Sequence, residues 1–69
     1  MTDVVDSDEL LRRIRRARDC AAQEEQSWRA RSAELRPADP DAAQDAVIRT
    51  LAYEAVVRVL DEVVRPGTR

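Results

Sequence analysis

Five arginines within seven residues form the segment of the chain that most invites a binding function. They are Arg12, Arg13, Arg15, Arg16 and Arg18. A guanidinium matches a phosphate through two parallel hydrogen bonds, and a basic stripe along a helix is typical of nucleic-acid-binding proteins. One candidate function is therefore a nucleic-acid-binding regulator that contacts phosphates through Arg12, Arg13, Arg15 and Arg16.

Acidic residues one helical turn from the arginines favour ion pairing instead. Opposite charges four residues apart stabilise a helix by about 0.2–0.5 kcal/mol per pair. The pairs at this spacing are Asp8–Arg12, Glu9–Arg13, Arg15–Asp19, Glu25–Arg29, Asp45–Arg49, Glu54–Arg58 and Asp61–Arg65. The basic segment also has no interleaved aromatic residues to stack on bases, and the sequence has no glycine-rich phosphate loop. We therefore expect most of these arginines to form ion pairs.

The residue types that usually carry catalysis or bind metals are scarce. Histidine is absent, and with it the commonest general base and zinc ligand. The adjacent carboxylates of Glu24-Glu25 and Asp61-Glu62 point about 100° apart on a helix and do not converge. Asp41 and Asp45 have a spacing that suits a metal site, but acidic residues at a helix start commonly stabilise the helix dipole. We expect no catalytic residue, no metal and no cofactor, and hence no enzyme.

The lone Cys20 excludes an internal disulfide and fits a reducing compartment, where we expect it to be a semi-buried small apolar residue. No apolar run approaches the ~18–20 residues of a membrane span, and the acidic start of the chain does not resemble a secretory signal. We therefore expect a cytoplasmic protein. All twelve basic residues are arginine, which, with the abundance of alanine, aspartate and valine, suggests a bacterial source with a GC-rich genome.

Two segments, at about 7–35 and 40–64, have the apolar spacing of α-helices. The first carries an apolar residue at every seventh position, at Ile14, Ala21, Trp28 and Leu35. Asp6-Ser7-Asp8-Glu9 predicts its start, because these side chains accept hydrogen bonds from free backbone amides and favour the positive end of the helix dipole.

A short break at 36–39 separates the two predicted helices. Pro37 disfavours helical angles at the preceding residue, and Asp39-Pro40 is typical of an N-cap followed by a first-turn proline. A loop of this length usually joins antiparallel helices. The sequence therefore predicts an all-α antiparallel two-helix hairpin, forming a single small helical domain over 1–69 with frayed tails at 1–6 and 66–69.

The second predicted helix is apolar over more of its circumference than one neighbour can cover. In its second half the apolar residues span roughly half of the helix surface, whereas a surface helix needs a stripe of about 100°. They are Val56, Val57, Val59, Leu60, Val63 and Val64. A chain of 69 residues seldom obtains more than about 3–5 kcal/mol from its own core. We therefore expect a homodimer, most simply a four-helix bundle.

The interface residues expected for this dimer are Leu51, Val56, Val59, Leu60, Val63 and Trp28. The function predicted from them is a small non-catalytic interaction or adaptor module that self-associates. One alternative is a docking or antitoxin-like subunit, in which another protein covers the same valines. The net charge of −2 argues against a general nucleic-acid or anionic-membrane binder, so neither is expected as a partner.

Overall fold

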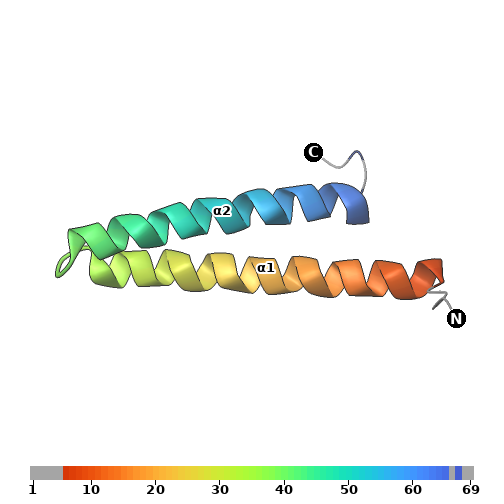
Figure 1. Cartoon of the computed structure of the whole chain (residues 1–69), viewed down its shortest axis with the longest axis horizontal. Helices are drawn as coiled ribbons and strands as arrows, with labels where there is room; N and C mark the ends of the chain where they lie inside the picture. The colour runs from red at the N-terminus through yellow and green to blue at the C-terminus, as the bar shows by residue number, and fades with distance from the viewer. Residues whose placement is uncertain (1–5, 66, 68–69) are drawn as a thin grey trace, which may run out of the picture.

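Two antiparallel α-helices joined by a short loop make up the described structure (Figure 1). This computed structural model describes residues 6–65 and Gly67. Helix α1 spans Ser7–Leu35 and helix α2 spans Pro40–Val64. The predicted helical hairpin is therefore confirmed, with the expected helix bounds. Of the tails predicted at 1–6 and 66–69, residues 1–5, 66 and 68–69 lie outside the described part of the chain.

Both helices begin at an aspartate whose side chain caps the first turn. The Asp6 carboxylate accepts a hydrogen bond from the Glu9 amide at 2.7 Å, and the Asp39 carboxylate accepts one from the Ala42 amide at 3.1 Å. Each bond satisfies an amide that has no partner within its helix. The carbonyl of Leu35 closes the first helix by accepting from the amides of Ala38 and Asp39. These local signals explain why the sequence predicts the helix ends well.

Small residues form the buried contact between the helices. The buried residues in the described part of the chain are Ala21, Ser32, Ala43, Ala46 and Thr50. The Thr50 hydroxyl donates to the Ala46 carbonyl and the Ser32 hydroxyl donates to the Arg29 carbonyl, both at 2.8 Å. Each buried hydroxyl is thus satisfied within its own helix. No large side chain among the described residues is fully buried, so the hairpin has only a thin core.

The two helices lie closest near the loop and diverge toward their free ends, where the first turns of α1 extend past the end of α2 (Figure 1). Four of the five buried residues, namely Ser32, Ala43, Ala46 and Thr50, lie in the half of the hairpin near the loop. Small side chains allow backbones to approach closely. The larger apolar residues near the contact between the two helices are half-buried, including Leu11, Ile14, Trp28, Val57, Leu60 and Val64.

Candidate functional site

An exposed apolar surface extends along α2. It consists of Ile48, Ala52, Ala55, Val56, Val59 and Val63, which we call the outer face. At about 100° per residue these positions share one side of the helix, and that side is roughly opposite the buried residues Ala43, Ala46 and Thr50. Helix α2 therefore packs one apolar side on α1 and presents a second to solvent.

The branched residues of the outer face are substantially exposed. The exposed fraction is 56% for Ile48, 45% for Val56, 66% for Val59 and 49% for Val63. Val56 and Val59 line a shallow open groove with Ala55 and the neighbouring Leu60. Scattered apolar residues are normal on a protein surface, but a contiguous apolar patch is typical of an interaction site.

The six residues expected at an interface do not all lie on the outer face. Val56, Val59 and Val63 belong to it. Leu51 is exposed on one flank of this face, and the half-buried Leu60 lies on the other flank, toward α1. Trp28 belongs to α1.

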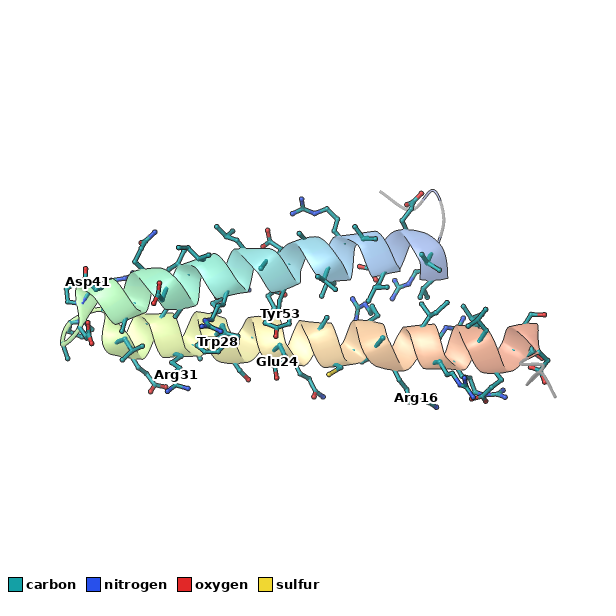
Figure 2. The ribbon with its side chains drawn as sticks, in the orientation of Figure 1. Arg16, Glu24, Trp28, Arg31, Asp41 and Tyr53 are labelled. Carbon is teal, nitrogen blue, oxygen red and sulfur yellow. The ribbon has the colours of Figure 1, made fainter. Side chains whose placement is uncertain are left out.

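Trp28 is half-buried between the helices. Its ring lies beneath two guanidiniums, with the Arg49 Cζ atom 4.8 Å and the Arg31 Cζ atom 5.4 Å from the ring centroid. Figure 2 shows Tyr53 extending from α2 toward α1, farther from the loop than Trp28. Both aromatic residues of the chain therefore contribute to packing within the hairpin, and cation–π contacts link Trp28 to both helices.

Ile48, Ala52 and Ala55 complete the outer face but are absent from the interface predicted from sequence. The signal that could have found them is the spacing of Ile48, Ala52, Ala55 and Val59, which matches successive turns of one helix side. The alanines are inconspicuous beside the valines, although small residues allow close helix packing.

The candidate nucleic-acid residues gather around one carboxylate. Glu9 accepts hydrogen bonds from Arg12 at 3.0 and 3.2 Å and from Arg13 at 3.0 Å. The Arg16 guanidinium lies 3.9 Å from the same carboxylate, and Figure 2 shows Arg16 on the side of α1 that faces away from α2. Arg15 is exposed and makes no ion pair within the described residues. Three of the four arginines are thus partly neutralised by Glu9.

Three of the ion pairs predicted from spacing are confirmed, namely Glu9–Arg13, Glu25–Arg29 and Glu54–Arg58. Among the remaining predicted pairs, Arg12 and Asp19 bind the nearer Glu9 and Arg18 of the same helix instead, and tertiary contacts replace the other two. Arg49 lies over Trp28, and Asp61 pairs with Arg18 of the other helix.

Two of the ion pairs join the helices. Arg18 Nε donates to Asp61 Oδ1 at 2.7 Å, and Arg29 Nη2 lies 3.5 Å from Glu54 Oε2. The hydrogen bond from Arg18 holds the pKa of the Asp61 carboxyl below its ordinary value. The same bond raises the pKa of Arg18, and Asp19 acts in the same direction. These pairs fix which residues of α1 lie beside which residues of α2.

The expectation of a semi-buried Cys20 is wrong, because this residue is exposed. Its position on α1 is turned roughly 120° from the side that faces α2. Within residues 6–65 and Gly67, no group of three or more potential metal-ligating side chains is present. Neither described helix combines the length and the hydropathy needed to cross a membrane.

Comparison of the chain with protein-family models, with curated proteins and with solved structures finds no match.

Proposed function

We propose that this protein is a small non-catalytic interaction module that self-associates through the outer face of α2. The observation that carries the proposal is the contrast between the two sides of this helix. The side toward α1 buries only small residues completely, whereas the opposite side exposes Ile48, Val56, Val59 and Val63.

The energetic reason is that the hairpin leaves much of its apolar surface in water. Complete burial of a valine, leucine or isoleucine side chain is worth about 1.5–3 kcal/mol relative to exposure. Val59 is 66% exposed in the single chain. Most of the stabilisation that its burial could provide is therefore gained only when another surface covers it. A dimer obtains that contribution from both copies.

In the proposed dimer, α2 lies between its own α1 and the second copy. The outer face points roughly away from α1, so the four helices follow the order α1, α2, second α2, second α1 across the assembly. Val56, Val59 and Val63 are central in this contact, Leu51 and Leu60 flank it, and Trp28 remains within each hairpin. This is a flatter four-helix arrangement than a square bundle.

Replacing Val59 with aspartate tests the proposal, because it places a charge at the centre of the outer face. We expect the wild-type chain to have twice its 7.8 kDa mass in light scattering. Val59→Asp should give the monomer mass with reduced helicity in circular dichroism. Burying an unpaired carboxylate in an apolar contact costs several kcal/mol, which shifts a dimer toward monomer by 100-fold or more.

Gln26→Asp is the matched control, since Gln26 is exposed on α1 and outside the outer face. It should leave the mass and the helicity unchanged. A wild-type chain that is monomeric and helical at every concentration would contradict self-association and would favour a different protein as the cover of this face.

The basic segment supports the nucleic-acid alternative less well, because Glu9 already pairs with Arg12, Arg13 and Arg16. That function stays a prediction from the sequence.

A further inference from the structure

The outer face has a pattern of positions that is symmetric about its midpoint, between Ala55 and Val56. Ala52 lies three residues before Ala55, and Val59 lies three residues after Val56. Ile48 lies seven residues before Ala55, and Val63 lies seven residues after Val56. A two-fold contact between identical surfaces brings each position against its counterpart. An antiparallel pair of α2 helices would therefore match the whole face with itself.

We infer that two copies pair α2 against α2 in antiparallel orientation, with the two-fold axis between Ala55 and Val56. The inference rests on the proposed self-association and adds the orientation and the register. It places Ile48 opposite Val63 of the second copy, and Ala52 opposite its Val59.

Side-chain size favours the antiparallel orientation. In this register each alanine of the outer face meets a valine, because Ala52 faces Val59 and Ala55 faces Val56. Matching small residues to large ones fills the space between two helices without voids or overlap. A parallel pair would place alanine on alanine at positions 52 and 55 and valine on valine at position 59. A distance between the helices that suits the alanine pairs would then be too short for the valine pair.

Charge favours the same orientation. Asp41 and Asp45 lie in the first turns of α2, on the same side as the outer face, and Arg65 follows its last turn. A parallel pair would bring the aspartates of the two copies together, which is unfavourable. The antiparallel register separates the aspartates of the two copies, brings Asp45 to within one residue of the level of Arg65 of the second copy, and sets the two helix dipoles in opposite directions.

Thiol cross-linking between Ile48→Cys and Val63→Cys tests the orientation, with Cys20→Ser in both chains to remove the exposed native thiol. In the antiparallel register these positions face one another, whereas the two copies of position 48 are about 22 Å apart along the helix axis. The two variants are mixed unfolded, refolded together and treated with a short bis-maleimide. Intact mass spectrometry then separates the mixed conjugate from same-variant conjugates, because the two chains differ in mass.

We expect the mixed conjugate to exceed each same-variant conjugate by about tenfold or more. Same-variant conjugates in excess would overturn the antiparallel inference while leaving self-association intact. A dimer mass in light scattering without any conjugate would also overturn this register. A monomer mass for the Cys20→Ser parent would remove both the inference and the proposed function.

A second pair and a control keep the result interpretable. Ala52→Cys with Val59→Cys probes the same register nearer the two-fold axis. This pair tests the orientation if Ile48→Cys or Val63→Cys fails to fold. Gln26→Cys is exposed on α1 and should give no conjugate with either end variant.

Discussion

Arg18 is a charged residue at a position where a helical hairpin usually has an apolar one. It lies seven residues after the half-buried Leu11, on the side of α1 that faces α2, and its guanidinium binds Asp61 at 2.7 Å. A misaligned hairpin, shifted by one turn, would separate the two charges. We therefore expect this pair to set the register of the helices, a role that ion pairs between helices have in some other proteins.

The lowered pKa of Asp61 predicts a loss of stability in acid. A carboxyl whose pKa is lower in the folded chain contributes stability above its unfolded pKa and loses it as the pH falls through the folded value. The difference in unfolding free energy between wild type and Asp61→Asn should therefore be constant near neutral pH and shrink below about pH 5. Urea unfolding at a series of pH values, at matched chain concentration, measures it.

Glu24→Gln is the control for this titration, because Glu24 is exposed and makes no ion pair within the described part of the chain. Its difference from wild type should be small throughout. A wild-type advantage over Asp61→Asn that persists unchanged at the acid end would show that the carboxylate charge does not matter.

At the scale of the helices, close approach near the loop depends on small side chains. Ala46 is only 1% exposed, and Ala43 and Thr50 lie on the same side of α2. A larger residue at any of these positions would separate the helices or force unfavourable rotamers.

Ala46→Leu should therefore lower the unfolding free energy by about 1–3 kcal/mol, despite the similar helix propensities of the two residues. Ala30→Leu makes the same change at an exposed position of α1, and it should shift the unfolding free energy by less than about 0.5 kcal/mol. Chemical unfolding followed by circular dichroism compares them. Equal effects at both sites would contradict a tight contact at Ala46.

The helices themselves could be predicted from local signals, since Asp6 and Asp39 cap their starts and Pro37 and Pro40 mark the break between them. The side of each helix that faces the other is harder to predict. Helix α2 is apolar on two sides, and the spacing of its apolar residues does not show which side contacts α1. The exposure of Cys20 is hard to predict for a related reason, because which side of α1 is buried depends on where α2 packs against it. The Arg18–Asp61 pair, 43 residues apart, has no local signal at all.

At the scale of the whole molecule, the thin core described above makes the proposed self-association testable through stability. A dimer that supplies the missing burial gains about 1.4 kcal/mol of apparent stability for each tenfold rise in concentration. The melting temperature should therefore rise by about 5 °C per tenfold increase. Thermal unfolding followed by circular dichroism over a hundredfold range of concentration measures this, and a melting temperature that does not change would contradict an obligate dimer.

The fluorescence of Trp28 should report the opening of the hairpin and not the dissociation of the proposed dimer. It is the sole indole of the chain, and its ring is covered by Arg49 from α2, so its emission spectrum should change when the hairpin opens. Because Trp28 lies on α1 and does not belong to the outer face of α2, dissociation of the proposed dimer into two intact hairpins should leave that emission nearly unaltered. Fluorescence and light scattering together can therefore separate opening of the hairpin from dissociation of the pair.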